Sequence, residues 1–267
     1  MSHPQAPSAE PVLLAVQDGV ATVTINRPGA RNALNMDVKL ALAEAVGEIA
    51  SRPDVRAVVL TGAGGSFCAG GDIVEMGLND TPVASRSRLA RLLDELVIPL
   101  AELEKPTIAA IEGHAHGAGL SLALACDLIV AAEDAVLSCA FVKLGLVPDC
   151  GALYFLPRRL PMGIAKELVF TGRRILGTEA HELGLVNRVT TPGTALAVAS
   201  ALAAELAAGA TVALGLTKRL MENATSMSLR ELAQFEALGQ AVAYSTQDHL
   251  AARTAFQQKG SAVFTGR

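Results

Sequence analysis

Two short segments near the start of the chain carry the pattern of paired strands. VLLAV at 12–16 and VATVTIN at 20–26 are rich in valine and flank Gln17-Asp18-Gly19. The Asp-Gly pair is typical of a tight reversal between antiparallel strands. We therefore predict a β-hairpin over 12–26.

A helical repeat follows this hairpin. Asn35 is a candidate N-cap, and charged residues occupy the face opposite to four apolar positions: Val38, Leu42, Val46 and Ile49. Apolar residues spaced three and four apart form one face of a helix. We predict a helix that begins after Asn35 and ends near 51–53.

The central part of the chain alternates between apolar runs, glycine-rich turns and helical segments. The predicted strands cover 56–62, 107–113 and 128–134, and the predicted helices cover 84–104 and 117–126. Strands that alternate with helices in this order form sheets that are largely parallel. The fold class that follows is α/β.

The pattern changes after about residue 190, where the segments become helical and rich in alanine and leucine. We place a boundary near Pro192-Gly193. The prediction divides the chain into a loose tail at 1–11, a core at 12–192, and a helical region at 193–267 that serves packing or assembly.

Composition restricts the classes of partner. The chain has 267 residues, of which 51% are hydrophobic, and its net charge of −4 gives no general attraction for nucleic acid. Its most apolar tract, 118–132, is interrupted by Ser121 and Asp127 and is shorter than the roughly 20 residues that cross a bilayer. The first residues lack the pattern of a signal peptide. We expect a cytoplasmic protein with no nucleic-acid or membrane partner.

Thiols and imidazoles give no strong metal signature. His114-Ala115-His116 could place two imidazoles on one face of a strand, but no third ligand stands at a familiar spacing, so we expect no metal. The chain has four cysteines without a Cys-x-x-Cys pair, which we expect to be reduced and mostly buried: Cys68, Cys126, Cys139 and Cys150.

Two glycine-rich loops follow predicted strands. GAGGSFCAGGD at 62–72 and GHAHGAGLS at 113–121 contain no lysine, which excludes a P-loop, and neither contains Gly-x-Gly-x-x-Gly. Glycine and alanine leave backbone N–H groups accessible. The loops therefore indicate close approach of the backbone to a ligand.

A nucleophilic serine is one interpretation of the second loop. The segment 119–123, Gly-Leu-Ser-Leu-Ala, approximates the Gly-x-Ser-x-Gly elbow of hydrolases. Asp149 with His181 or His249 would follow Ser121 in the required chain order. His181 lies in an ordinary helical segment, which favours a surface or core-edge position.

A single carboxylate stands in an apolar and basic stretch, LGLVPDCGALYFLPRRL at 144–160. In one interpretation, Pro148-Asp149-Cys150-Gly151 forms a β-turn or a helix entry, since aspartate at such a position bonds nearby backbone N–H groups. In the other, Asp149 is a catalytic acid or base.

Five motifs in order carry a resemblance to the enoyl-CoA hydratase/isomerase, or crotonase, superfamily, from about residue 12 to the C-terminus. They are NRPGARNALN (26–35), SFCAGGDI (66–73), IEGHAHGAGLSLALACDLIVA (111–131), FVKLGLVPDCGALYFLPRRL (141–160) and GLVNRV (184–189). The resemblance implies a spiral of repeated ββα units and C-terminal helices that assemble homotrimers, commonly stacked as hexamers.

The resemblance also implies the substrate and its binding residues. One backbone N–H from each glycine loop, at Gly71 and Ala118, would hold the thioester oxygen of an acyl-CoA, and coenzyme A would enter as part of the substrate rather than as a cofactor. Ala118 opens a helix, so the helix dipole adds to its N–H. The positions that match coenzyme A contacts are Arg31, Ala33, Ala69, Asp72, Ile73, Phe256 and Lys259, the last two sometimes reaching a neighbouring subunit.

The chemistry departs from that of the hydratases in this superfamily. They carry glutamates at the positions matching Ser121 and Phe141, where this chain has no ionisable group near neutral pH. Asp149 matches the single acidic residue of the isomerases, and one carboxylate is sufficient to take a proton from one carbon and return it to another. We expect an apolar pocket of Phe141, Leu144, Leu146 and Val147 to raise the pKa of Asp149.

The sequence therefore favours an enoyl-CoA isomerase in which Gly71 and Ala118 hold an enolate and Asp149 transfers the proton. Ser121 would bond the substrate or a water, or serve only the helix. Three alternatives stay open: a hydratase with atypical acid/base residues, a thioesterase or esterase that depends on Ser121, and an acyl-CoA binder without turnover.

Overall fold

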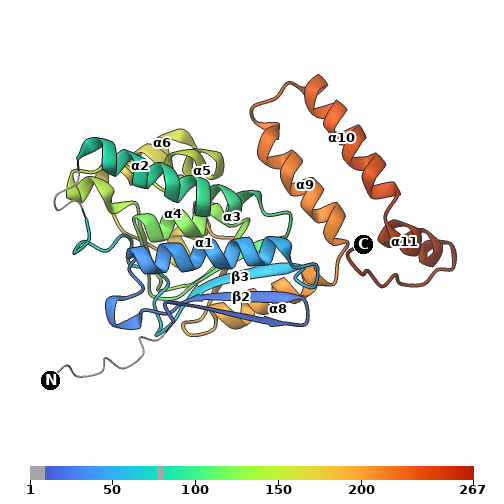
Figure 1. Ribbon diagram of the computed structural model, residues 1–267, viewed down its shortest axis with the longest axis horizontal. Helices are drawn as coiled ribbons and strands as arrows, with labels where there is room; N and C mark the ends of the chain where they lie inside the picture. The colour runs from blue at the N-terminus through green and yellow to red at the C-terminus, as the bar shows by residue number, and fades with distance from the viewer. Residues whose placement is uncertain (1–9, 77–80) are drawn as a thin grey trace.

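The computed structural model describes residues 10–76 and 81–267, and its main element is a six-stranded sheet in the order β1-β2-β3-β4-β6-β9 (Figure 1). β1 and β2 are antiparallel, and every other neighbouring pair is parallel. The strands are β1 Val12–Gln17, β2 Val20–Ile25, β3 Ala57–Gly62, β4 Thr107–Ile111, β6 Leu128–Ala132 and β9 Arg188–Thr190. The predicted hairpin and the α/β class are confirmed. Most of the expected tail, residues 1–9, lies outside the described residues.

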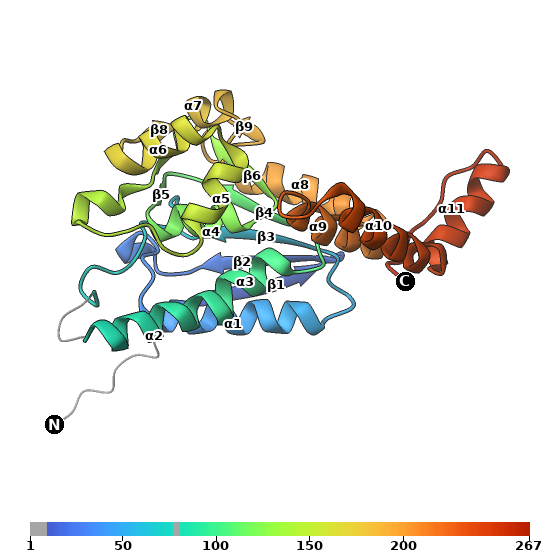
Figure 2. The ribbon, with the colours of Figure 1, turned by 90° about the horizontal axis from the view of Figure 1, so that it is seen from above.

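Helices cover both faces of this sheet, which explains why β3, β4 and β6 are buried at nearly every position. Along β3, Val58 and Leu60 join one buried cluster, and Ala57 and Val59 join another on the opposite face. The first cluster includes α1 (Met36–Ser51), α3 (Ile98–Glu102) and α4 (Ala118–Ala125), and α8 (Ala195–Ala207) covers the second (Figure 2).

The helices predicted after Asn35 and over 84–104 are both present. Asn35 caps α1 by accepting from the Val38 N–H at 3.0 Å, and α1 buries the four apolar positions that its sequence repeat marked. The helix predicted over 84–104 is divided into α2 (Pro82–Leu92), a π-helical turn (Leu93–Val97) and α3. Pro99 stands at the start of α3 and has no N–H to donate, so the change of helical register just before it has a local cause.

A second layer of short strands runs beside the main sheet in the order β5-β7-β8. The strands are β5 His114–His116, β7 Val136–Ser138 and β8 Ile175–Leu176. Two isolated parallel bridges, Leu34 with Gly71 and Cys68 with Ala115, add to this layer. β5, β7 and β8 have no pattern of their own that marks them as strands, because two or three residues cannot show alternation.

The two layers arise from a repeated path of the chain. Each turn gives one strand to the main sheet, then one extended segment to the second layer, and then a helix. β4, β5 and α4 make one such turn, and β6, β7 and α5 (Ala152–Arg159) make the next. The expected spiral of ββα units is therefore present.

The C-terminal helices leave the body of the protein after α8. α9 (Thr211–Ala224) and α10 (Leu229–Tyr244) form an antiparallel pair that projects from the sheet, and α11 (Gln247–Gln257) lies beside the end of the pair at which α9 begins (Figures 1 and 2). α8 follows the expected boundary near Pro192-Gly193 but packs on the sheet, so the projecting part begins at α9. The remaining helices, α6 (Met162–Thr171) and α7 (Gly177–Glu182), lie near the second layer.

No helix among residues 10–76 and 81–267 has by itself the length and apolar content of a membrane span, although the bent pair α8 and α9 meets that composition when taken together. All four cysteines are buried and free, as the sequence predicts.

Asp127 joins the sheet to the projecting helices. Its Oδ2 atom accepts from the Thr107 N–H at 2.7 Å and from Lys218 Nζ at 2.9 Å, and the Lys218 side chain is only 8% exposed. We expect Asp127→Asn to lower the free energy of unfolding by about 3 kcal/mol, because the buried ammonium loses its counter-charge. Urea denaturation measures this change.

The matched control is Glu102→Gln, which breaks an exposed pair with Arg219. Its effect should stay below about 1 kcal/mol. Equal losses in the two variants would show that the contact of Asp127 with Lys218 has no special weight.

Candidate active site

The two glycine loops lie against each other because successive turns of the spiral pair there. The Cys68 N–H donates to the His114 carbonyl at 2.8 Å, and the His116 N–H donates to the Cys68 carbonyl at 3.0 Å. Gly70 has φ +100°, and a Cβ atom there would lie 2.7 Å from the His116 oxygen. Only glycine allows this approach, so glycine at position 70 is required by the packing of the loops.

The backbone N–H groups of Gly71 and Ala118 are without a hydrogen-bond acceptor within the described part of the chain. Gly70 and Asp72 both bond to Leu34, through a carbonyl and an N–H. Because successive N–H groups of extended backbone point to opposite sides, the Gly71 N–H faces away from Leu34. Ala118 is the first residue of α4, where N–H groups have no intrahelical partner.

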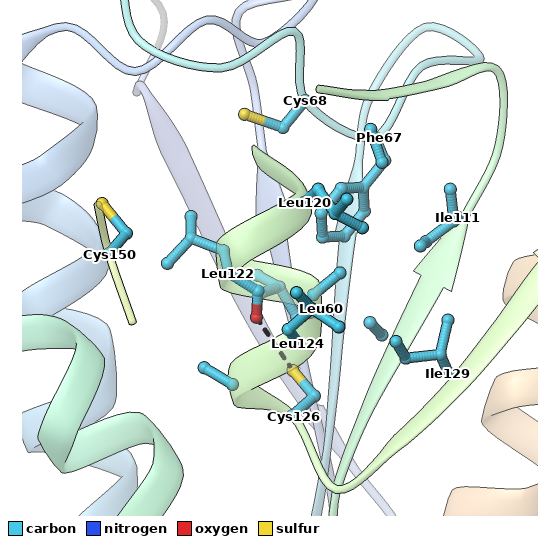
Figure 3. Packing of buried hydrophobic residues seen from close by; sticks show 14 of the residues in the cluster. Leu60, Phe67, Cys68, Ile111, Leu120, Leu122, Leu124, Cys126, Ile129 and Cys150 are labelled. Carbon is cyan, nitrogen blue, oxygen red and sulfur yellow. Dashed lines mark hydrogen bonds between the residues drawn. The ribbon is translucent and has the colours of Figure 1, made fainter. Parts of the chain in front are cut away.

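The helix α4 is buried on every side, so its N-terminus is held rigidly. All eight of its residues are buried, and Figure 3 shows Leu120, Leu122 and Leu124 packed among residues of the core. Gly119 lies directly against the backbone and side chain of Cys68, with no room for a Cβ atom. A donor at the start of such a helix needs little reorganisation to meet a ligand.

Asp149 stands in a backbone turn, and its half-buried side chain has one buried carboxylate oxygen. The Ala152 N–H donates to the Asp149 carbonyl at 3.1 Å, which closes the turn. The residue that caps α5 is Gly151, not Asp149. The Oδ1 atom of Asp149 is buried and has no partner among the described residues. A buried carboxylate oxygen without a partner is costly in a purely structural role and suits a group that meets a substrate.

The electrostatics of Asp149 favour a group that can carry a proton. Burial raises the pKa of Asp149 above its ordinary value, while the thiol of Cys150 and the charge of Lys39 on α1 act in the opposite direction. The predicted direction of this shift is confirmed. A carboxyl with a raised pKa is a better match for proton transfer near neutral pH.

The prediction of an apolar pocket around Asp149 is only partly correct. Phe141 is buried, and its ring lies over Gly117. The prediction is wrong for the other three residues, which are 45% to 75% exposed: Leu144, Leu146 and Val147. Leu144 ends the 3₁₀ turn Ala140–Leu144, and Leu146 and Val147 follow it along the surface.

Ser121 lies one turn after Ala118 and is fully buried. Its hydroxyl donates to the Gly117 carbonyl at 3.1 Å, which is a common bond of serine within a helix. Neither histidine of the hydrolase interpretation meets it. His181 contacts the Val186 carbonyl through Nδ1, and His249 packs on Tyr244 in the projecting region. This arrangement does not form a Ser-His-Asp triad.

The expected coenzyme A contacts fall into two groups. Arg31, Ala33, Ala69, Asp72 and Ile73 lie on two adjacent segments, which the Ala69 N–H joins by donating to the Arg31 carbonyl at 2.9 Å. The other group, Phe256 and Lys259, lies at the end of α11, far from this place in the same chain (Figure 2). Phe256 is 85% exposed.

Asp72 is already paired. It accepts from Arg27 Nη1 at 2.5 Å and from the Val74 N–H at 3.0 Å, and the bond with Arg27 is the main cause that lowers its pKa. No sequence pattern marked Arg27 as the partner of Asp72 that links the two segments. Asn32, which is fully buried, was also missed. The only sequence signal was their common place in NRPGARN, 26–32.

The two histidines of β5 do not form a metal site with a third ligand in the described residues. Their rings stack at 5.2 Å, and His116 Nδ1 lies 2.7 Å from the Ser138 hydroxyl. Burial is the main cause that lowers the pKa of His116 to about 4, so its imidazole is neutral at neutral pH.

The sequence profile of the enoyl-CoA hydratase/isomerase family matches residues 15–267. The 1,2-epoxyphenylacetyl-CoA isomerase of Escherichia coli is 36% identical over 96% of this chain and 98% of its own length. The short-chain-enoyl-CoA hydratase of Clostridium acetobutylicum is 38% identical over 93% of this chain and 95% of its own.

Solved structures agree over the whole fold. The crystal structure of an enoyl-CoA hydratase from Polaromonas sp. JS666 has 34% sequence identity and a TM-score of 0.90, and it covers 95% of this chain and 99% of its own. An enoyl-CoA hydratase from Bacillus anthracis has 31% identity and the same TM-score, covering 96% and 100%.

The raised pKa of Asp149 predicts a pH-dependent cost in stability. Between its unfolded value near 3.8 and the raised folded value, the folded protein holds more protons than the unfolded chain, so stability falls as the pH rises through this window. Asp149→Asn cannot ionise. We expect it to gain stability relative to the wild type as the pH rises, with the largest difference at neutral pH.

Urea unfolding of both proteins from about pH 4 to about pH 8 measures this difference. Asp134→Asn, at an exposed turn between β6 and β7, is the control and should show no such trend. A stability difference for Asp149→Asn that is constant over this range would contradict the burial of an ionised carboxylate.

Proposed function

The chain belongs to the enoyl-CoA hydratase/isomerase family and has the crotonase fold, and we propose that it shifts a carbon–carbon double bond of an enoyl-CoA. One observation carries this proposal: Asp149 has a buried carboxylate oxygen without a partner in the described residues, while positions 121 and 141 hold serine and phenylalanine. A single carboxylate suits movement of a proton between two carbons.

The proposed reaction begins with a 3-enoyl-CoA. Asp149 takes a proton from C2, and the electron pair of that C–H bond moves toward the thioester carbonyl and gives a dienolate with the negative charge on oxygen. The protonated Asp149 then returns the proton at C4, the double bond settles between C2 and C3, and the carboxylate is regenerated. No water or redox partner is consumed.

The N–H groups of Gly71 and Ala118 would stabilise the oxygen charge in this step. Their lack of protein acceptors leaves both donors available, and the buried helix α4 keeps the second one in place. Donors of this kind act mainly on the charged intermediate and its transition states, since the neutral carbonyl accepts weaker bonds.

The alternatives receive less support. A hydratase must activate water. Because neither position 121 nor position 141 has an ionisable group, this enzyme would lose acid/base catalysis worth a rate factor of about 10² to 10⁴ per group. The hydratase name of the Clostridium relative is the observation that favours this alternative. A thioesterase that depends on Ser121 conflicts with the full burial of that side chain. A binder without turnover would leave the cost of burying Asp149 unexplained.

We further propose that the coenzyme A moiety lies along the adjacent segments that carry Arg31, Ala33, Ala69, Asp72 and Ile73. Phe256 and Lys259 would then act on the site of a neighbouring copy in a homotrimer or a dimer of trimers. The separation of the end of α11 from these segments within one chain and the apolar residues exposed on α10 support this arrangement.

Asp149→Asn tests the proton transfer. We expect kcat for conversion of 3-enoyl-CoA to 2-enoyl-CoA to fall by about 10² to 10⁴, because the amide cannot accept the proton. The change in absorbance on conjugation with the thioester gives the rate. Asp134→Asn, an exposed change of the same kind, should retain full activity. Activity of Asp149→Asn within a few fold of wild type would sink the assignment of the base.

Ala118→Pro tests the oxyanion donor. Proline is tolerated at the first position of a helix, so this change removes one N–H without breaking α4. We expect kcat to fall by about 10² to 10³ while the melting temperature stays near that of the wild type. Met162→Pro, at the first position of α6, is the matched control and should leave kcat unchanged. A stable and fully active Ala118→Pro protein would show that its N–H is not used.

A further inference from the structure

The segment between β2 and α1 is folded around one buried amide. Asn32 is 0% exposed and adopts a left-handed conformation with φ 59°. Its Oδ1 atom accepts from the Arg27 N–H at 2.9 Å, and its own N–H donates to the Arg27 carbonyl at 2.9 Å. These two bonds close the segment 27–32 into a fixed loop.

The same side chain also holds the first glycine loop. The Asn32 Nδ2 atom donates to the Ala63 carbonyl at 2.9 Å and to the Ser66 carbonyl at 2.6 Å. The loop is folded so closely here that a Cβ atom on Gly62 would lie 2.6 Å from Nδ2 and would overlap the Ser66 carbonyl. Both amide hydrogens of Asn32 are therefore used to fix residues 62–66.

Backbone bonds carry this constraint to the Gly71 N–H. On either side of Asn32, the Arg31 carbonyl accepts from the Ala69 N–H at 2.9 Å, and the Leu34 N–H donates to the Gly70 carbonyl at 2.8 Å. The Asp72 N–H then donates to the Leu34 carbonyl at 3.2 Å. Gly71 therefore lies between Gly70 and Asp72, which both bond to Leu34, next to the loop whose shape Asn32 sets.

We propose that Asn32 is a positioning residue, whose amide clamps the loops at 27–34 and 62–72 and so aligns the Gly71 N–H with the thioester oxygen. This inference rests on the proposed function, because it assumes that the Gly71 N–H binds an oxyanion. Asparagine suits the position because it offers two donors and an acceptor in one short side chain and tolerates left-handed backbone.

Alternative residues fail for separate reasons. Aspartate keeps the shape and the bond from Arg27 but places an oxygen against the Ala63 and Ser66 carbonyls. Glycine keeps the backbone conformation and removes all three side-chain bonds. The two substitutions therefore separate the amide from the backbone conformation that it accompanies.

The test compares Asn32→Gly with the matched control Asn35→Gly. Asn35 lies three residues later, and its side chain bonds only to the start of α1, by accepting from the Val38 N–H. Two readouts distinguish positioning from general stability. One is the separation of kcat from KM for 3-enoyl-CoA. The other is the ratio of the Kd for butyryl-CoA to that for acetoacetyl-CoA, whose enolate offers a charged oxygen.

We expect Asn32→Gly to lose about 10- to 100-fold in kcat, since a displacement of about 1 Å costs up to 10²-fold, with KM changed by less than about threefold. The preference for acetoacetyl-CoA should fall in parallel. Asn35→Gly should keep kcat and the Kd ratio within about twofold of wild type, because glycine at an N-cap costs only a few tenths of a kcal/mol.

An Asn32→Gly protein that folds and keeps both kcat and the Kd ratio overturns the inference alone. A wild-type protein that shows no preference for acetoacetyl-CoA overturns the proposed oxyanion site and this inference with it. If Asn32→Gly does not fold, Asn32→Asp decides by the same two readouts at a temperature where circular dichroism shows it folded. Failure of both variants to fold would assign Asn32 to the fold instead of the site, and would equally overturn the proposal.

Discussion

The backbone pairing between successive turns of the spiral is the constraint on which the rest of the structure depends. The bridge between Cys68 and Ala115 uses only main-chain atoms, yet it places the loop after one turn against the start of α4 in the next. Because of this bridge, the loops that carry the N–H groups of residues 71 and 118 are in direct contact, although the two residues are about 47 positions apart in the sequence. A main-chain site of this kind depends on glycine where the backbones touch, at Gly70 and Gly119, and little on the chemistry of side chains.

The Asp149 carboxylate differs from the main-chain N–H groups, because its pKa is set by its surroundings and not by backbone pairing. Burial makes ionised Asp149 unfavourable, and the Cys150 thiol and Lys39 partly offset this. Its unpartnered Oδ1 atom costs folding free energy if the residue is only structural. The same atom is useful if a substrate binds with a C–H group that has no other acceptor for its proton. The same low-dielectric surroundings that raise the pKa also strengthen the attraction between N–H donors and a negative oxygen. In the proposed reaction, Asp149 and the two N–H groups would therefore both benefit from the exclusion of water.

Sequence patterns predict those parts of the fold that contain their own information. The hairpin, α1 and the main-sheet strands β3, β4 and β6 are long enough for an apolar run, alternation or helical spacing to appear. β9, at the edge of that sheet, has only three residues and was not predicted. β5, β7 and β8 have two or three residues each, and their hydrogen bonds come from partners far away in the chain, so no local pattern marks them. Leu144, Leu146 and Val147 look like core residues by type alone, but the chain after the 3₁₀ turn runs along the surface. Asn32 gave no signal, because a buried asparagine is distinguished from an exposed one only by the carbonyls that surround it in the folded protein.

The replacement of two expected glutamates by Ser121 and Phe141 has a structural consequence that bears on the chemistry. The Ser121 hydroxyl donates to the Gly117 carbonyl, and the ring of Phe141 covers the same glycine. This side of the glycine loop at 113–121 is therefore apolar and is covered by the chain itself. A water molecule that had to be activated there would find no ionisable group, whereas a hydrocarbon chain with a double bond would find favourable contacts. In the proposed isomerisation, which has one carboxylate at Asp149, the group that removes the proton would also have to return it. A raised pKa serves both halves of such a transfer, because it makes the carboxylate a stronger base and still leaves its acid able to protonate a dienolate.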